Sequence, residues 1–205
     1  MRLRPRHLTN LAPEEGDLEV MDRWGLSRCD VVDMASVSSQ LTKLLVDDAA
    51  PSTDARELAG WICGRRHSLQ ENRLEEAIAI ATRAELVHRR DDAWPHGLAD
   101  QLIEMLDCVV THQQREHAVV FPMLFRGVDA LPDQTIDEMV AAHEDLMERW
   151  RGLDELTAGF RAPAHACAAW RLLYVLCYKL SADCREQVGL ENRMLLAGRP
   201  TRHPG

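Results

Sequence analysis

Six polar side chains at helical spacing constrain this chain more than any other feature of its sequence. In chain order they are His67, His112, Glu116, His143, Gln187 and Glu191. Two pairs among them are four residues apart, so the members of each pair lie one turn apart on the same helix face and reach the same buried point. The other two are single histidines on separate helical stretches. This pattern is typical of a carboxylate-bridged two-metal site inside a four-helix bundle.

Apolar residues recur at intervals of three and four over four long segments, and patterns typical of strands are nearly absent. The segments cover about residues 55–90, 98–126, 133–159 and 164–197. Asp54 with Glu57 three residues later is typical of a helix start, and Gly127 is typical of a helix end. Because the connections are short, we expect an all-α fold, an antiparallel up-down-up-down four-helix bundle over residues 54–198. Residues 1–50 are expected to form a short helical N-terminal appendage, and residues 199–205 a C-terminal tail.

The helix rise of about 1.5 Å per residue tests whether the six side chains share one level of such a bundle. His67 lies about 18 Å from the start of the first helix, and His143 about 15 Å from the start of the third. The four paired residues lie about 9 to 21 Å before the ends of the second and fourth helices. In an antiparallel bundle these heights coincide, so we expect the six side chains to converge on one layer.

Composition excludes several classes of function. A net charge of -9 and a pI near 5.5 argue against a nucleic-acid partner, because phosphate binding needs a concentrated basic face. The one basic run, Arg2, Arg4 and Arg6, is expected to be a solvated tail. No apolar stretch approaches the roughly 18 residues of a membrane span, and the Arg-rich start lacks the apolar segment of a secretory signal. We therefore expect no membrane partner and a cytoplasmic location, where cysteines without paired spacing stay reduced.

Histidine and carboxylate ligands together suit iron or manganese, whereas a structural zinc ion or an iron–sulfur cluster would require clustered thiolates. Each glutamate offers two oxygens and can bridge two ions, while the imidazoles complete the outer positions. We therefore expect two iron ions in a di-iron centre, with manganese as the alternative. Open positions at such a centre would bind a small ligand such as NO, O2 or peroxide, and an apolar lining would exclude bulk water.

Several short motifs resemble those of a known family. They are His112 with Glu116, Val120-Phe121-Pro122-Met123, His143, and Leu190-Glu191-Asn192. In this order they resemble the hemerythrin-like fold, and most closely the repair-of-iron-centres (RIC) di-iron proteins of bacteria, over roughly residues 67–199. The resemblance implies bridging glutamates at Glu116 and Glu191 and histidine ligands at His67, His112 and His143. It also implies a role in nitrosative and oxidative stress, through NO binding or support of damaged iron–sulfur centres.

The chain departs from this family at two places. Where the family carries a fourth histidine, four residues before the last glutamate, this chain has Gln187. An amide oxygen is a neutral and weaker donor, so Gln187 either holds one ion less tightly or lies beside the ligands, with Cys184 as the alternative ligand. Family members also carry adjacent cysteines in a small N-terminal module, whereas the similar stretch here offers Cys29 followed by Asp30. A thiol-dependent step in cluster repair would therefore lack its second thiol.

The sequence thus predicts a non-haem di-iron protein of the stress response that binds NO or O2 and supports iron–sulfur client proteins. The alternatives are a di-iron oxidase, a reductase of NO or peroxide, and a non-catalytic sensor or iron-storage module. Turnover is left open, as is the choice between monomer and dimer. Of the remaining histidines, His117 is expected to be solvated, and His88, about 31 Å along the helix from His67, to meet the C-terminal helix dipole.

Overall fold

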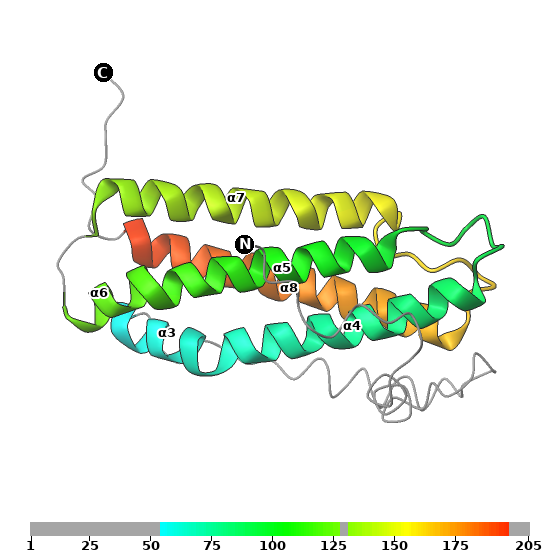
Figure 1. Ribbon diagram of the computed structural model, residues 1–205, viewed down its shortest axis with the longest axis horizontal. Helices are drawn as coiled ribbons and strands as arrows, with labels where there is room; N and C mark the ends of the chain where they lie inside the picture. Colours follow the sequence, from blue (N-terminus) through cyan, green and yellow to red (C-terminus); the bar gives the residue numbers. More distant parts are fainter. Residues whose placement is uncertain (1–53, 128–130, 197–205) are drawn as a thin grey trace, which may run out of the picture.

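The computed structural model describes residues 54–127 and 131–196, which form a bundle of long antiparallel helices (Figure 1). In chain order the helices are α3 (Ala55–Trp61), α4 (His67–Val87), α5 (Leu98–Arg115), α6 (Phe121–Phe125), α7 (Asp133–Leu156) and α8 (Ala168–Leu196). Two π-helical turns, η1 (Ile62–Arg66) and η2 (Glu116–Val120), join α3 to α4 and α5 to α6. No strand occurs within the described residues, and the predicted all-α four-helix bundle is confirmed.

The predicted N-terminal appendage and C-terminal tail lie outside the described residues, as do Cys29 and Asp30. The domain limits expected from the sequence therefore stay predictions. None of the helices between residues 54 and 196 that the structure describes is both long enough and apolar enough to cross a membrane.

Local side-chain and backbone chemistry sets where the helices begin and end. The Asp54 carboxylate accepts hydrogen bonds from the backbone N–H groups of Arg56 and Glu57, both at 3.0 Å, and so caps the first helix as the sequence predicts. Gly127 follows α6 with a φ of 72°, a left-handed conformation that glycine adopts at little cost. The start of α3 and the end of α6 are therefore fixed by signals that are local in the sequence.

The fourth helix begins at Ala168, four residues later than the sequence pattern predicts. The Arg171 guanidinium donates hydrogen bonds to the backbone carbonyls of Ala164, at 2.6 Å, and Ala166, at 3.0 Å. These carbonyls would otherwise accept from the backbone of a helix. A side chain from the first turn of α8 thus holds the preceding segment outside the helix.

The bundle contains two apolar clusters with a polar layer between them. α4 packs against α5 and α8, and α7 packs against the same two helices. The larger apolar cluster fills the half of the bundle that contains the α4–α5 and α7–α8 connections, and the smaller one lies among α3, α6 and the ends of α7 and α8. The buried polar side chains between them are Arg66, His67, Gln70, His112, Gln113, Glu116, His143, Gln187 and Glu191.

Both π-helical turns adjoin this polar layer. η1 ends one residue before His67, and η2 begins at Glu116, whose carbonyl accepts from the N–H of Phe121 five residues later. Such a turn holds one extra residue, which rotates the side chains that follow by about 100° relative to a regular α-helix. A regular helix that buries His112 and Glu116 would also turn Val119 inward, but Val119 is 40% exposed, while Val120 and Phe121 are each 1% exposed.

Candidate metal centre

The structure brings all six predicted side chains into the buried polar layer. None of them is more than 6% exposed. His67 is the first residue of α4, His112 lies in α5, Glu116 begins η2, His143 lies in α7, and Gln187 and Glu191 lie in α8. The bundle has four helical arms: α3 with η1 and α4, α5 with η2 and α6, α7, and α8. All four arms therefore contribute side chains to one layer, as the helix rise per residue predicted.

Each glutamate presents one oxygen between two imidazoles. Glu116 Oε2 lies 3.2 Å from His67 Nε2 and 3.5 Å from His112 Nε2. Glu191 Oε2 lies 3.7 Å from His112 Nε2 and 3.0 Å from His143 Nε2. Divalent ions such as zinc hold nitrogen and oxygen ligands at about 2.0–2.2 Å, so neighbouring ligands of one ion lie about 2.8–3.6 Å apart. The observed separations are close to those of ligands around shared ions.

Four of the six side chains form a compact group in which each offers a ligand atom within 4.8 Å of the others. They are His112, Glu116, His143 and Glu191. Within the described ranges, this is the only group of three or more such side chains. His67 and Gln187 extend the group on one side, because His67 contacts Glu116 and Gln187 contacts Glu191.

Among the buried atoms of this layer that have no hydrogen-bond partner in the described residues, five face one another. They are the Nε2 atoms of His67, His112 and His143 and the Oε2 atoms of Glu116 and Glu191. Burying a polar atom without a partner costs about 1–3 kcal/mol, and a charged group costs more. Cations between these atoms would satisfy all five of them, so the residues present fit a bound metal.

The charges of the layer are also incomplete without a cation. Burial, and then the nearby Glu191 carboxylate, raises the pKa of Glu116 to about 8. Burial acts in the same direction at Glu191, but the adjacent imidazoles of His112 and His143 hold its pKa below the usual range. The protein alone therefore keeps one carboxylate ionised and the other protonated near neutral pH. Both can ionise together when positive charge lies between them.

Two of the imidazoles also contact a second side chain through their outer nitrogen. His143 Nδ1 donates to Asn192 Oδ1 at 2.7 Å, which leaves Nε2 as the nitrogen that faces the layer. His67 Nδ1 lies 3.0 Å from His117 Nε2, and the ring of Phe121 stacks on His67 with the ring centres 5.8 Å apart. Such outer contacts orient the imidazoles of a metal site and raise their basicity.

Sequence reasoning missed both outer partners. His117 is exposed, as expected, but its ring also stacks on His67 with the ring centres 5.1 Å apart, a contact that the sequence did not predict. The π turn that begins at Glu116 carries this ring toward α4, and no sequence pattern signals that turn. Asn192 had a usable signal, since it directly follows the predicted ligand Glu191 in the Leu190-Glu191-Asn192 motif.

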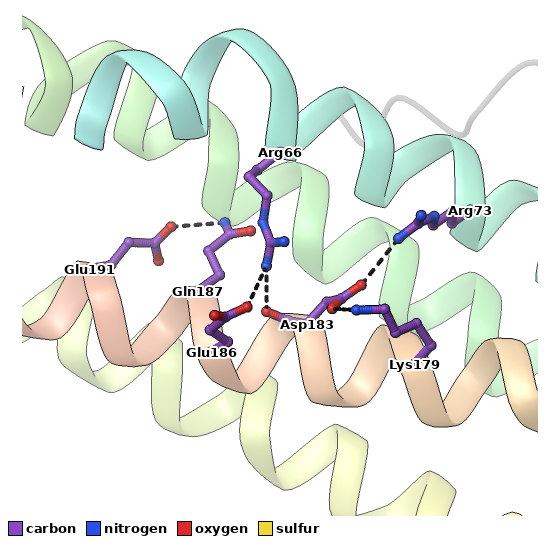
Figure 2. A network of polar contacts seen from close by, with 7 residues as sticks. All are labelled: Arg66, Arg73, Lys179, Asp183, Glu186, Gln187 and Glu191. Atoms are coloured by element: carbon purple, nitrogen blue, oxygen red, sulfur yellow. Dashed lines mark hydrogen bonds and ion pairs between the residues drawn. The ribbon is translucent and has the colours of Figure 1, made fainter. Parts of the chain in front are cut away.

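Gln187 faces the centre through its amide nitrogen. The Gln187 Nε2 atom donates a 2.8 Å hydrogen bond to Glu191 Oε1 (Figure 2), the oxygen that does not lie between imidazoles. The amide thus orients the Glu191 carboxylate, and it does so at the position where the family resemblance implies a histidine ligand. Cys184, the alternative ligand, lies outside the compact group, and burial raises the pKa of its thiol to about 12. A thiol held protonated in this way is a poor metal ligand.

A network of ionic contacts fastens α4 to α8 beside the layer (Figure 2). The guanidinium of Arg66, which lies over the Trp61 ring, donates to the Asp183 carbonyl at 3.0 Å and lies 3.5 Å from Glu186 Oε2. The Asp183 carboxylate in turn pairs with Arg73, at 3.1 Å, and with Lys179. Because Arg66 directly precedes His67, this network fixes the height of His67 relative to α8. The sequence did not predict this network, since the contacts of Arg66 and Arg73 with α8 join residues more than 100 positions apart.

Comparison with known proteins is consistent with this geometry. The domain family described as the Hemerythrin HHE cation binding domain matches residues 63–197, which include all six side chains. The chain is 31% identical over 171 residues to the iron-sulfur cluster repair protein YtfE of Musicola paradisiaca, covering 80% of this chain and 76% of that protein. It is 32% identical over 167 residues to the protein of the same name from Pectobacterium carotovorum, with coverage of 78% and 74%. The iron-sulfur cluster repair protein DnrN of Neisseria gonorrhoeae is 32% identical over 136 residues, covering 66% of this chain and 85% of that protein.

The match to the domain extends over more than half of the chain, and the similarity to these relatives extends over most of it. The motifs of the second, third and fourth helices had predicted the same relationship. The chain therefore belongs to the hemerythrin family, defined by the HHE cation binding domain.

Proposed function

We propose that this chain is a non-haem di-iron protein of the nitrosative and oxidative stress response, and that it supports the repair of iron–sulfur centres in client proteins. The observation that carries the proposal is the layer of five buried donor atoms without hydrogen-bond partners in the described residues. The cation binding domain supports the presence of a metal. The relatives, which are named as iron-sulfur cluster repair proteins, support the class of client.

Two ions would share the two glutamates. His112 and His143 would complete the ligand set of one ion, because both Nε2 atoms lie within 3.7 Å of Glu191 Oε2 and the two ring centres are 4.7 Å apart. His67 would hold the other ion, next to Glu116. Bound iron supplies one-electron chemistry and open coordination positions for a small ligand such as NO or O2.

The protein's own groups prepare this layer in three ways. The hydrogen bond from His143 to Asn192 fixes which imidazole nitrogen faces inward, and the stacked rings of His117 and Phe121 hold His67 in place. The apolar clusters on both sides exclude bulk water. The ion pairs of Figure 2 keep α4 and α8 in register. Each of these contacts lowers the cost of organising the ligands when metal binds.

A surface groove next to the layer is a suitable approach for a small ligand. Its volume is about 430 Å³, and it lies between α4 and the α5–η2 arm. The lining residues are Glu71, Val110, Gln113, Gln114, His117 and Ala118. His117 connects the groove to the layer, because the same side chain contacts His67. A diatomic ligand in this groove would therefore lie beside the imidazole that contacts His67.

The two halves of the centre differ in donor strength. One ion would have two imidazoles, whereas the other would have the imidazole of His67 and, at most, the amide oxygen of Gln187. A neutral amide is a weaker donor to iron than an imidazole. The ion beside His67 should therefore be released first, which suits a protein that gives iron to damaged clusters.

Iron loading followed by ligand titration tests the proposal on the full chain. We expect two irons per chain by elemental analysis, a visible absorption spectrum, and a change in that spectrum when NO is added. His143→Ala should lose iron, while His96→Ala, which removes an exposed histidine outside the layer, should not. Absence of iron binding would refute the metal centre, and unchanged spectra with both NO and O2 would refute the ligand class.

Steady-state consumption of NO or peroxide separates a binding protein from an enzyme. Repair is tested by adding the iron-loaded chain to an iron–sulfur enzyme inactivated with NO. The wild type should restore activity, and the Glu116→Ala variant, which lacks a shared ligand, should not. Equal restoration by both proteins would contradict a role for the metal layer. The cytoplasmic location and the oligomeric state stay predictions.

A further inference from the structure

A second cluster of titratable and nucleophilic side chains lies where α4 ends and α8 begins, at one end of the bundle (Figure 1). Its members are His88, Asp91, His165 and Cys167. His88 lies about 31 Å along the helix axis from His67, so the cluster is separate from the metal centre. We propose that Cys167 is a nucleophilic thiol that reacts with small hydroperoxides, with His88 as its base and Asp91 as the group that orients His88.

The side chains of this cluster form a linear chain of contacts. Cys167 Sγ lies 3.2 Å from His88 Nε2. On the other side of the ring, His88 Nδ1 lies 3.7 Å from Asp91 Oδ2, and the same oxygen lies 2.9 Å from His165 Nε2. A thiol next to an imidazole, with the imidazole held by a carboxylate, is the arrangement of an activated cysteine nucleophile.

The same geometry argues against a metal ion shared by these groups. Metal ligands converge on one point, as the Nε2 and Oε2 atoms of the central layer do. His88 instead uses its two ring nitrogens in different directions, one toward Cys167 and one toward Asp91. When Nδ1 carries the ring proton, on the side of the Asp91 carboxylate 3.7 Å away, Nε2 keeps its lone pair for the proton of the thiol.

Two indole rings hold His88 in this orientation. His88 stacks on Trp94 with ring centres 5.6 Å apart and an interplanar angle of 14°, and its ring lies 5.0 Å from that of Trp170. Both tryptophans are buried, at 2% and 0% exposure. The indole nitrogen of Trp94 is a buried donor without a partner in the described residues. An imidazole fixed in this way needs no reordering before it accepts a proton.

The N-terminus of α8 also favours the ionised form of the Cys167 thiol. The Cys167 carbonyl accepts the first hydrogen bond of α8, from the N–H of Arg171 at 3.1 Å, so Cys167 occupies the N-cap position of a 29-residue helix. The positive end of the helix dipole favours a negative charge there. The Arg171 guanidinium is fixed nearby on the carbonyls of Ala164 and Ala166.

The cluster is also accessible to a small molecule. Cys167 is half-buried, and the side chain of His165, which lies beyond Asp91, is 59% exposed. The titratable groups in the chain of contacts from the Cys167 thiol are His88 at the end of α4, Asp91 in the loop that follows, and His165 in the segment before α8. The two histidines can carry positive charge, and Asp91 is the acidic member of this chain of contacts.

The expected reaction is a two-electron oxidation of the thiol. The thiol proton moves to His88 Nε2, and the sulfur attacks the nearer oxygen of the hydroperoxide. The S–O bond forms as the O–O bond breaks, and the departing oxygen takes the proton from His88 and leaves as water or an alcohol. Sulfur becomes a sulfenic acid, and the hydroperoxide is reduced by the same two electrons.

Alkylation with iodoacetamide, followed by peptide mass spectrometry, measures this reactivity on the full iron-loaded chain. Cys108 is a matched internal control, because it is also half-buried but its thiol contacts the Asp145 carboxylate at 3.3 Å in place of an imidazole. Burial, and then that contact, raises the pKa of Cys108 to about 11. At pH 7 we expect Cys167 to react at least about tenfold faster than Cys108. Equal rates at the two thiols would overturn the proposal.

The pH profile of alkylation then tests the part played by His88. In the wild type, the rate at Cys167 should show an inflection well below the ordinary thiol value of about 8.5. His88→Gln should move the inflection to that value or above and lower the rate at pH 7 several-fold. Unchanged kinetics in this variant would show that His88 is not the base. The wild-type profile decides the question by itself if the variant does not fold, since an inflection at or above 8.5 refutes an activated thiol.

Hydrogen peroxide is the probe for the class of substrate. Treatment of the full chain with one equivalent should block alkylation at Cys167 before Cys63 or Cys108, and a thiol reductant should restore it. His88→Gln should slow the blocking in parallel with its effect on alkylation. Equal oxidation of the three thiols, or oxidation of Cys167 that ignores the substitution, would overturn the assignment to hydroperoxides. Loss of iron binding at the central layer would leave these results unchanged, so the two proposals fail separately.

Discussion

Replacement of Glu116 by glutamine should have opposite effects on the metal-free and the iron-loaded protein. The pKa of Glu116 is raised to about 8, whereas a glutamate in the unfolded chain has a value of about 4.5. Between these two pH values the folded state binds more protons than the unfolded state. The free energy of unfolding therefore falls as the pH rises: the contribution of protonated Glu116 is fully present below pH 4.5 and is lost as the pH rises toward 8. At about 1.4 kcal/mol per unit, some 2.5 units between pH 4.5 and pH 7 amount to about 3 kcal/mol.

Glutamine has nearly the shape of the protonated acid and does not ionise in the unfolded chain. In the metal-free protein, the change in the free energy of unfolding caused by Glu116→Gln should therefore be more favourable at pH 7 than at pH 4, by up to about 3 kcal/mol. This corresponds to a rise of roughly 6–12 °C in Tm for a domain of this size. With iron at a thousandfold excess over Kd, the wild type gains about 4 kcal/mol, which the variant should largely lose.

Thermal unfolding of chelator-treated and iron-loaded protein at pH 4 and pH 7 measures these effects. Glu144→Gln, at an exposed glutamate of α7, is the matched control and should change neither state by more than about 0.5 kcal/mol. If Glu116→Gln destabilises the metal-free protein equally at both pH values, the buried acid does not carry the raised pKa. If iron stabilises the variant as much as the wild type, Glu116 is not a ligand.

Three further substitutions test individual contacts of the layer. Gln187→His should slow the release of the more labile iron to a chelator by at least about tenfold, since an imidazole replaces an amide; one uniform rate in both proteins would show that Gln187 is not at the metal. Asn192→Ala removes the acceptor of the His143 Nδ1–H group and should weaken iron affinity by about 10- to 100-fold in competition titrations, whereas unchanged affinity would make that hydrogen bond irrelevant. Arg66→Met leaves the Asp183 carbonyl without this donor and should cost about 1–3 kcal/mol in urea unfolding, with a neutral result showing that the network of Figure 2 does not stabilise the bundle.

The fold and the composition of the layer could be predicted because both depend on regular helix geometry. Apolar spacing of three and four residues fixes which face of each helix is buried, and the rise per residue fixes the height of each polar side chain. Short connections leave little choice in how neighbouring helices run. The pairs that begin at His112 and Gln187 therefore meet the histidines of the other arms without any knowledge of packing details.

Features that break this regularity could not be predicted in the same way. A π turn has no sequence signature comparable to a cap, so the exposure of Val119 and the contact between His117 and His67 were missed. Contacts between residues distant in the sequence, such as the pair of Arg66 with Asp183, depend on how the packed helices align side chains.

The late start of α8 shows the same limit. It depends on the Arg171 side chain, which takes backbone carbonyls that a helix would use. Propensity and periodicity describe the backbone of a segment taken alone, and they contain no information on a side chain that competes for its hydrogen bonds. The same is true of Cys167 and His88, which are 79 residues apart in the sequence and which the bundle brings together.

Iron content per chain, measured together with the visible spectrum, tests the shared metal centre most directly. The wild type should bind two irons, His143→Ala should lose one preferentially, and Glu116→Ala should lose both together because it removes a shared carboxylate. A wild type that binds one iron or none, or a Glu116→Ala variant that retains two, would contradict a two-metal centre bridged by this glutamate.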